Sequence, residues 1–418
     1  MEGNARAQKY AWVILAVLTI AQVVMSMGAY AWGPLAPFLV AEFQVSRTQI
    51  GSLTSALFLF SVLMATPSGF LVDRYGARLM LIICLVAMGI PFAFLSLAKS
   101  YMFLMLFAAL CGLGYGVINQ VSTRGIMFWF NVKTRATAMG IKQSGVSIGG
   151  ALVAILLPAL SLAFRWQMAV VVVGFLMLMM AILSFLFYQE KPVSQTETFA
   201  SKAAKKPGGE LKGSLRQVIA HPDLKILTML AFLMSWSQTC ITSFYVLYLI
   251  ETFQYSEVVA GSFLTVAMIA GACGRIGWGI VSDRLFKGDR NKPMMIIGIV
   301  ATTGMLGTAL VTPGVPGGVI YLFAFFLGIS FLGWNAVLMV RVAEIAGAEL
   351  AASVMGIMST LAWVGIVIGP PVFGAVADQA GYFWGWLMLT VFGIIGLVSS
   401  LYIVWRSPAK ISKNMIGG

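Results

Sequence analysis

Charged residues are scarce in this chain of 418 residues. They make up 10% of it, whereas hydrophobic residues make up 60% and the mean hydropathy is +0.93. A soluble globular domain needs about 25% charged residues to cover its surface, so the composition excludes that class. Apolar runs recur along the chain. They are long enough to cross a bilayer as helices and too long for the roughly ten-residue strands of a membrane barrel. The sequence therefore predicts an all-α membrane protein.

Side chains that commonly perform chemistry are few as well. The chain has one histidine and four cysteines, and the cysteines lie inside apolar runs at spacings that suit neither a metal site nor a redox pair. Neither HExxH nor a phosphate-binding glycine loop is present. We predict no catalytic residue, no metal and no cofactor, with a membrane enzyme or a receptor as the alternatives outside transport. We also expect no cleavable signal peptide, because the first apolar run is too long for one.

Twelve apolar runs are candidate membrane spans, and a polar stretch at 189–222 divides them six and six. The expected spans are 10–39, 48–72, 79–98, 102–130, 135–163, 167–188, 224–251, 258–282, 293–312, 317–343, 351–376 and 382–405. The polar stretch is rich in Lys, Ser, Pro and Gly, which is typical of a linker. We therefore predict an N-terminal six-helix bundle (1–188), a cytoplasmic linker (189–222), a C-terminal six-helix bundle (223–405) and a cytoplasmic tail (406–418).

The net charge of +13 follows the predicted topology. With a cytoplasmic N-terminus, the outer loops hold only Arg47, Lys99 and Arg165, and most of the other basic residues fall on the cytoplasmic side. This distribution obeys the positive-inside rule and places both termini in the cytoplasm. It argues against nucleic-acid binding and is compatible with contact to anionic lipids. Short loops fit a bacterial inner membrane.

The two halves of the chain resemble each other. FLVAEFQVS at 38–46 matches YLIETFQYS at 248–256, and GFLVDR at 69–74 matches GIVSDR at 279–284 at the same offset. A second match, AMGIKQ from residue 138 and VMGIMS from residue 354, has a slightly larger offset. Two six-helix repeats in one orientation are a transporter architecture. The fold class predicted is twelve transmembrane helices in two pseudo-symmetric six-helix bundles.

Apart from Arg135 and Lys225 at the very ends of their spans, four basic residues lie within the predicted spans: Arg124, Lys142, Arg275 and Arg341. The fourteen acidic residues all lie in tails, in loops or near span ends, so no carboxylate occupies the middle of a span. Charges inside a membrane are costly and commonly mark a wet cavity or a substrate pathway. The excess of positive charge therefore predicts an anionic substrate, with Arg275 as its main contact and Lys142 and Arg124 beside it.

Residues 69–78, GFLVDRYGAR, match G-x-L-x-D-R-x-G-x-R, the signature of the loop between spans 2 and 3 in the major facilitator superfamily. The second half keeps Gly279, Asp283 and Arg284 and then departs from the pattern. The resemblance implies that the signature latches the cytoplasmic side during alternating access. A solvated loop that serves as a topology signal is the alternative. The implied gating residues are Gly69, Asp73, Arg74, Arg78, Asp283, Arg284, Arg341 and Glu344.

Arg275 is followed by Trp278, Gly279, Ser282 and Asp283, which resembles span 8 of the oxalate:formate antiporters and related monocarboxylate porters. The resemblance implies that Arg275 binds the substrate carboxylate. Many of those porters have an aspartate one turn earlier, where this chain has Gly271, and their proton relay is therefore in doubt here. The segments NQVSTRGIMFWF and RATAMGIKQSGVSIGG in spans 4 and 5 are similar to those of organic-anion and cyanate-type carriers.

Other roles stay open for the same charges. Arg275 could bond to span carbonyls or act in a gate, Lys142 could reach the interface or a gate, and Arg341 has Glu344 one helical turn away. Polar side chains in spans serve as often in bonds between helices as in substrate contacts. The further substrate-contact candidates are Tyr30, Asn119, Asn335, Gln238 and Tyr245.

We therefore predict a secondary transporter of a small organic anion, most simply a carboxylate, that works by rocker-switch alternating access as a monomer. Exchange for a counter-anion, proton symport and uniport all stay open. A phosphorylated or inorganic anion is the first alternative. A proton-coupled drug exporter is disfavoured because no membrane-embedded carboxylate is present.

Overall fold

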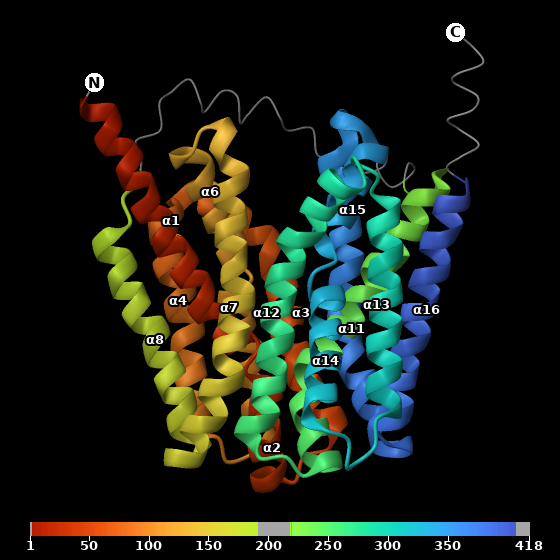
Figure 1. The fold of residues 1–418 in the computed structure, drawn as a ribbon. Helices are drawn as coiled ribbons and strands as arrows, with labels where there is room; N and C mark the ends of the chain where they lie inside the picture. Colours follow the sequence, from red (N-terminus) through yellow and green to blue (C-terminus); the bar gives the residue numbers. More distant parts are fainter. Residues whose placement is uncertain (1, 191–217, 219, 407–418) are drawn as a thin grey trace, which may run out of the picture. The chain divides into compact units, whose positions relative to one another are not determined.

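The computed structural model describes residues 2–190, 218 and 220–406, and this part contains helices and turns without any β-strand (Figure 1). The N-terminal part comprises α1 (Glu2–Ala29), α2 (Trp32–Phe43), α3 (Arg47–Tyr75), α4 (Ala77–Phe94), η1 (Leu95–Leu97), α5 (Tyr101–Tyr115), α6 (Ile118–Trp129), α7 (Val132–Phe164) and α8 (Trp166–Phe187). The C-terminal part comprises α11 (Pro222–Phe253), α12 (Glu257–Ile280), η2 (Val281–Leu285), α13 (Asn291–Leu310), α14 (Gly317–Leu327), η3 (Gly328–Leu332), α15 (Asn335–Ala380) and α16 (Tyr382–Arg406).

These helices form 12 stretches that are long and apolar enough to cross a membrane within the described residues. The predicted all-α membrane fold is therefore confirmed. Several predicted spans consist of more than one helix: α1 and α2 share the first, α5 and α6 the fourth, and α14, η3 and the start of α15 the tenth. Most of the predicted linker at 189–222 and nearly all of the tail at 406–418 lie outside the described residues.

The chain forms two compact units. One holds the described parts of Met1–Ala203 together with Thr242–Thr265, and the other holds the described parts of Ala204–Ile241 with Val266–Gly418. The end of α11 and the start of α12 thus belong to the unit that contains α1 to α8. The predicted boundaries of the two six-helix bundles stay a prediction.

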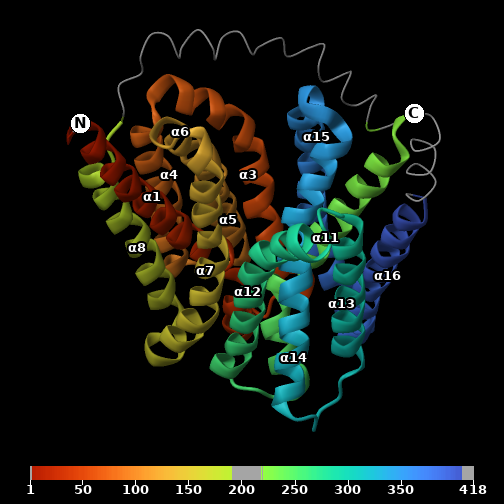
Figure 2. The same ribbon diagram turned by 45° about the horizontal axis from the view of Figure 1, so that its top comes forward.

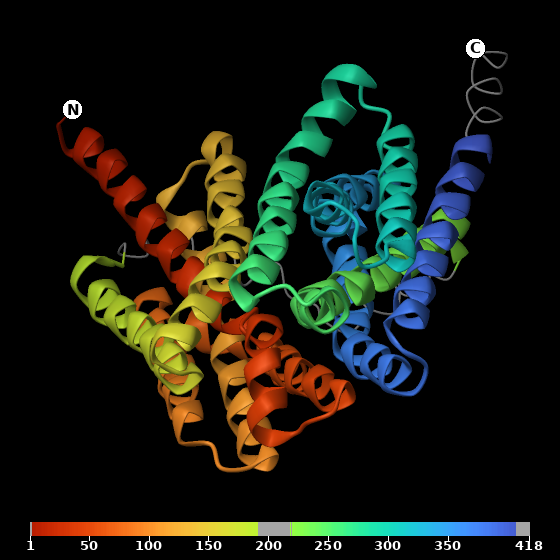
Figure 3. The same cartoon turned by 60° about the horizontal axis from the view of Figure 1, so that its bottom comes forward.

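Small residues allow the helices of each unit to pack closely. In the first unit, Gly89 of α4 faces Gly174 of α8, and a Cβ atom at Gly174 would lie 2.8 Å from the carbonyl oxygen of Gly89. The helices α1, α7 and α8 of this unit lie side by side (Figures 1 and 2). In the second unit α13 runs along α16 (Figures 1 and 3), with Gly393 set against Thr302.

The internal repeat is visible in the backbone. Gln44 and Gln254 follow α2 and α11 at equivalent repeat positions, and both have left-handed backbone angles, φ 51° and φ 58°. Ser46 begins α3 with a capping box: its hydroxyl accepts from the Gln49 N–H, and its own N–H donates to the Gln49 side chain. The sequence match at 38–46 and 248–256 therefore corresponds to one turn geometry used twice.

A second pair of equivalent turns differs in its residue. Arg165 joins α7 to α8 with φ 101° and ψ 151°, and Gly381 joins α15 to α16 with φ 90° and ψ 167°. Their spacing is the one that relates residues 138 and 354 in the second repeat match. Glycine adopts these angles without steric cost, whereas an L side chain is strained there by about 1–3 kcal/mol.

We expect Arg165→Gly to stabilise the protein by about 1 kcal/mol, because the strain relieved exceeds the backbone entropy that glycine adds. Thermal unfolding of the purified protein in detergent measures the change. Gly381→Arg is the matched variant, and we expect it to lower stability by about 1–3 kcal/mol. Destabilisation by Arg165→Gly would show that the arginine side chain makes a contact worth more than the strain.

Candidate functional site

Within the described residues, the first, fourth and tenth spans are interrupted in their interior, and each interruption lies next to a predicted substrate-contact residue. The α1 helix ends before Tyr30, the α5 helix is separated from α6 by Gly116 and Val117, and the tenth span passes through the π-helical turn η3. Asn119 follows the second interruption and Asn335 follows the third. Broken helices expose backbone groups inside the membrane, and in transporters they commonly frame substrate and ion sites.

Lys142 is the most deeply buried charged residue among those described. Its side chain on α7 is 1% exposed. Its ammonium donates a 2.7 Å hydrogen bond to the Oδ1 atom of Asn119 on α6, whose side chain is exposed. Among the described residues, no carboxylate lies within ion-pair distance of Lys142. A cation thus lies beside an exposed amide, and no described acidic side chain balances it.

Arg275 of α12 is half-buried and faces the interrupted tenth span. Its Nε donates to the carbonyl oxygen of Leu332 in η3 at 3.0 Å. Trp278, one turn further along α12, donates from its indole Nε1 to the carbonyl oxygen of Ile329 at 2.7 Å. The sequence left bonding of Arg275 to span carbonyls open, and the structure contains one such bond. A substrate contact by the same guanidinium stays a prediction.

The remaining substrate-contact candidates differ in exposure. Tyr30 is half-buried, with its ring 6.5 Å from that of Phe58. Gln238 and Asn335 are half-buried, whereas Tyr245 is completely buried. Tyr30 and Tyr245 belong to the first unit, and Gln238 and Asn335 to the second.

Arg124 of α6 joins the signature loop of the first unit. Its Nη1 donates to the carbonyl oxygen of Val72 at 2.8 Å and to Asp73 Oδ1 at 3.1 Å. Its Nε lies 4.0 Å from Glu190, just after α8, and its guanidinium stacks on the Phe128 ring. Arg124 was predicted beside the substrate, and within its unit the structure places it in a network with Asp73, a predicted gating residue.

Glu190 connects this network to the start of α4. Its carboxylate accepts from the Ala77 N–H at 2.8 Å and would collide with any Cβ at Gly76, which has φ 86°. A carboxylate at a helix N-terminus is stabilised by the helix dipole. Arg78 completes the contact between α4 and α8 by donating to the Phe185 carbonyl at 2.5 Å. Beside Glu190, burial raises the pKa of the Tyr188 phenol.

The second unit has a corresponding network at its signature. Arg290, just before α13, forms ion pairs with Asp283 and, at 3.0 Å, with Glu344. Glu344 also lies 3.8 Å from Arg341, its neighbour one turn back on α15. Hydrogen bonding to Asp283 is the main cause that raises the pKa of the Arg290 guanidinium. The structure thus brings Asp283, Arg341 and Glu344 together through a residue that was not predicted for the site.

The other predicted gating residues lie outside these networks. Arg74 is exposed and stacks on the Tyr75 ring, and Arg284 is exposed at the end of η2. A Cβ at Gly69 would come no closer than 4.0 Å to the Gln120 side chain. Two network residues were missed, Glu190 and Arg290, because both were assigned to loops. Their position directly at a helix end is the feature that could have identified them.

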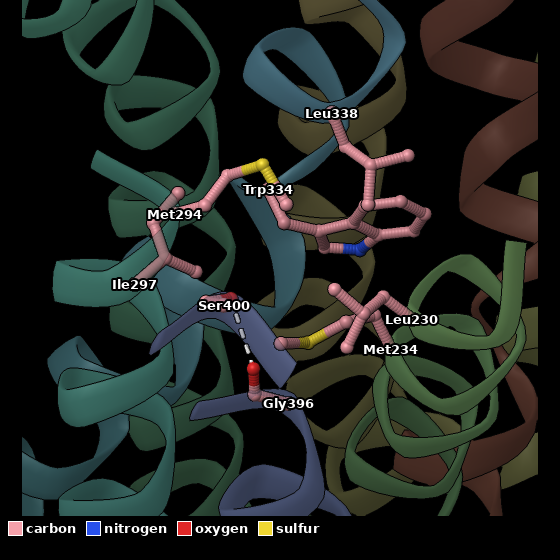
Figure 4. A pocket seen from close by; sticks show the side chains of 8 residues that line it. All are labelled: Leu230, Met234, Met294, Ile297, Trp334, Leu338, Gly396 and Ser400. Atoms are coloured by element: carbon pink, nitrogen blue, oxygen red, sulfur yellow. Dashed lines mark hydrogen bonds between the residues drawn. The ribbon is translucent and has the colours of Figure 1, made fainter. Parts of the chain in front are cut away.

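Two cavities within the described units are apolar. The second unit has one of about 20 Å³ among α11, α13, α15 and α16 (Figure 4). It is lined by Leu230, Met234, Met294, Ile297, Trp334, Leu338, Gly396 and Ser400. The first unit has one of about 290 Å³ along α3, α4 and α5, lined by no charged residue. Small-molecule sites need about 300–1,000 Å³ and a few convergent polar groups, so neither cavity suits an organic anion.

No group of three or more potential metal ligands occurs among residues 2–190, 218 and 220–406. The four cysteines are free thiols, of which Cys84, Cys111 and Cys240 are buried and Cys273 is exposed. Charged side chains in this part of the chain thus include the two networks at the signature positions, Lys142 with its amide partner, and Arg275 with its bond to Leu332.

Comparison with known proteins identifies relatives along most of the chain. A family model described as Major Facilitator Superfamily matches residues 18–366. The hexuronate transporter of Bacillus subtilis is 26% identical over 405 residues, which cover 94% of this chain and 93% of that protein. A probable sulfoacetate transporter of Cupriavidus necator is 24% identical over 382 residues, which cover 88% of each chain.

A similar solved structure is that of a bacterial homolog to the human lysosomal transporter Spinster, in an inward-facing and occupied conformation. It matches with a TM-score of 0.79 at 17% identity and covers 94% of this chain and 96% of that one. At this identity the likeness shows the fold.

Proposed function

Because the chain belongs to the major facilitator superfamily, we propose that it is a secondary transporter of a small organic anion that carries a carboxylate. The observation that carries the proposal is Lys142, a buried cation whose described partner is an amide. A buried charge without a counter-charge is strongly unfavourable, and an anionic substrate would supply the missing charge. A planar guanidinium at Arg275 matches a carboxylate geometrically.

The relatives support the same class of substrate. Hexuronate and sulfoacetate, the substrates in the names of two relatives, are both carboxylate-bearing anions. We propose Arg275, Lys142, Asn119, Tyr30 and Asn335 as substrate contacts. Gln238 and Tyr245 belong to the same proposed set, and Arg124 is proposed to guide the anion.

Transport would proceed by rocker-switch alternating access. The two charged networks at the signature positions, around Arg124 with Asp73 and around Arg290 with Asp283 and Glu344, are proposed to act in the cytoplasmic gate. Exposed ion pairs contribute only about 0–1 kcal/mol each, so such networks can break and reform within a transport cycle. We propose a monomer in a bacterial inner membrane with both termini in the cytoplasm.

A binding and uptake experiment tests this function. We expect D-glucuronate or sulfoacetate to raise the melting temperature of the purified protein, because a ligand bound only by the folded state stabilises it by about 3–4 kcal/mol at 100–1,000 times its Kd. Arg275→Ala should lose the shift. Proteoliposomes should accumulate the labelled anion chemically unchanged, which separates transport from catalysis.

The same binding experiment also tests the alternative substrates. A shift with hexose phosphates or inorganic anions, without one for carboxylates, would move the substrate to the phosphorylated or inorganic class. A shift with cationic amphiphiles alone, equal in wild type and Arg275→Ala, would contradict anion transport and favour a drug exporter.

A further inference from the structure

The tenth span contains a five-residue π-helical turn, η3 (Gly328–Leu332), between α14 and α15. Short π-helical turns inside membrane or soluble helices are frequently found at functional sites. Two backbone carbonyls of this turn accept hydrogen bonds from side chains of α12. Arg275 binds the Leu332 oxygen at 3.0 Å and Trp278 binds the Ile329 oxygen at 2.7 Å. Donors three residues apart on one helix thus meet acceptors three residues apart on the other.

Glycines bring the two backbones into direct contact at this place. A Cβ at Gly274 would lie 2.6 Å from the Ile329 oxygen, and one at Gly271 would lie 2.3 Å from the Leu332 Cβ. On the other side, a Cβ at Gly328 would lie 2.0 Å from the Ala267 oxygen. Separations below 3.0 Å from backbone atoms cannot be relieved by a side-chain rotation. The contact therefore exists only because these positions are glycine.

We propose that η3 is the element that positions Arg275. Gly274 and Trp278 hold the turn against α12, so that its Leu332 carbonyl fixes the orientation of the guanidinium. The inference rests on the proposed function, in which Arg275 contacts the substrate carboxylate. A guanidinium has a rigid planar fork, and its value for a carboxylate depends on the orientation of that plane. The carbonyl bond to Nε sets this orientation before the anion arrives, so less ordering is needed on binding.

The proposal gives η3 a defined role. A regular helix through 328–332 would use its carbonyls for its own N–H groups, whereas the π-helical turn presents two of them to α12. A displacement of the turn by a fraction of an ångström would rotate the plane of the Arg275 guanidinium and leave its positive charge in place. We therefore expect damage to the turn to affect discrimination between anions more than the overall attraction for them.

Gly274→Ala is the test variant, and Gly277→Ala is its matched control. Both lie on α12 within one turn of Arg275, but a Cβ at Gly277 meets nothing within 4 Å. We expect Gly274→Ala to weaken D-glucuronate binding about tenfold or more and to leave the maximal uptake rate within twofold. Gly277→Ala should match wild type. The ratio of affinities for a carboxylate and its phosphonate analogue should also fall in Gly274→Ala, which a loss of folded protein would not produce.

A second readout requires no ligand. Phenylglyoxal modifies arginine side chains, and mass spectrometry follows its rate at Arg275. We expect modification at least fivefold faster in Gly274→Ala than in Gly277→Ala, because the Nε–carbonyl bond is weakened. Trp278→Phe keeps an aromatic side chain and removes the indole N–H that bonds to the turn, so it should give an intermediate rate. This variant keeps the test valid if Gly274→Ala does not fold.

The outcomes separate the two levels of inference. If Arg275→Ala binds D-glucuronate and sulfoacetate as wild type does, or wild type binds no anion, the proposed function fails. If Arg275→Ala abolishes binding while Gly274→Ala and Trp278→Phe match Gly277→Ala in affinity, selectivity and modification rate, the positioning role of η3 is wrong and the proposed function stands.

Discussion

Lys142→Met is expected to weaken anion binding about 100-fold or more and, at the same time, to make the ligand-free protein more stable. The Lys142 side chain is 1% exposed and its described partner is the Asn119 amide. Removal of a buried charge without a counter-ion relieves a desolvation penalty, so we expect a gain of about 1–3 kcal/mol. Met has nearly the same length and flexibility as Lys without the charge, so packing is preserved.

The same substitution should weaken D-glucuronate binding about 100-fold or more, which corresponds to about 2.7 kcal/mol. Thermal unfolding with and without the anion measures both effects in one experiment. Lys225→Met is the control, since Lys225 is an exposed lysine on α11 and its replacement should change neither quantity. A variant that is less stable and still binds the anion would show that Lys142 is a structural residue.

A double-mutant cycle tests whether Asn119 is the hydrogen-bond partner of Lys142. Asn119→Ala removes the acceptor from a buried ammonium, so in wild type we expect it to cost about 1–3 kcal/mol. In the Lys142→Met background the same change should be nearly neutral, because the donor is gone. Equal costs in both backgrounds would mean that the Asn119–Lys142 hydrogen bond makes no net contribution.

Much of the fold follows from local sequence features. The twelve spans depend on runs of apolar residues, and the repeated turns at Gln44 and Gln254 depend on a short match between the halves. Such features need no knowledge of which helices are neighbours. The break in the tenth span was not predicted, since Gly328 and Gly333 are unremarkable in a sequence rich in glycine, and their role depends on how closely α12 approaches.

The site was less predictable because charges pair across the fold. Arg341 and Glu344 lie one turn apart on a helix, and their contact could be expected from spacing alone. The contact of Arg124 with Asp73 joins residues 51 positions apart, and Arg290 reaches Glu344 across 54 positions. Sequence composition indicated that the interior carries excess positive charge. Only helix packing decides which cations are neutralised within the protein.

The end of α11 and the start of α12 pack against the N-terminal helices of their unit through glycines. A Cβ at Gly261 would lie 2.0 Å from the Ala154 oxygen, and one at Gly33 would lie 2.1 Å from the Thr242 oxygen. Beside these contacts, the Thr54 and Ser243 hydroxyls are hydrogen-bonded at 3.1 Å. Arg47 and Glu251 form a 2.7 Å ion pair, and their side chains are 30% and 28% exposed. Partly exposed pairs of this kind contribute about 1 kcal/mol or less, so we expect the glycine contacts to matter more for the packing of these segments.

Gly261→Ala is expected to open the packing of the end of α11 and the start of α12 against the N-terminal helices of their unit. An added methyl group against a backbone oxygen costs about 1–3 kcal/mol, which shifts a closed-to-open equilibrium about 5- to 150-fold. The measurement is the rate at which a maleimide labels Ser243→Cys in a protein without its four native cysteines, since Ser243 is 2% exposed when this end is closed. We expect labelling about tenfold faster or more with Gly261→Ala and a similar increase with Gly33→Ala. Gly140→Ala, where a Cβ meets nothing within 4 Å, should leave the rate unchanged. If Gly261→Ala instead lowers the melting temperature and leaves labelling slow, the packing is permanent and the prediction that this end opens is wrong.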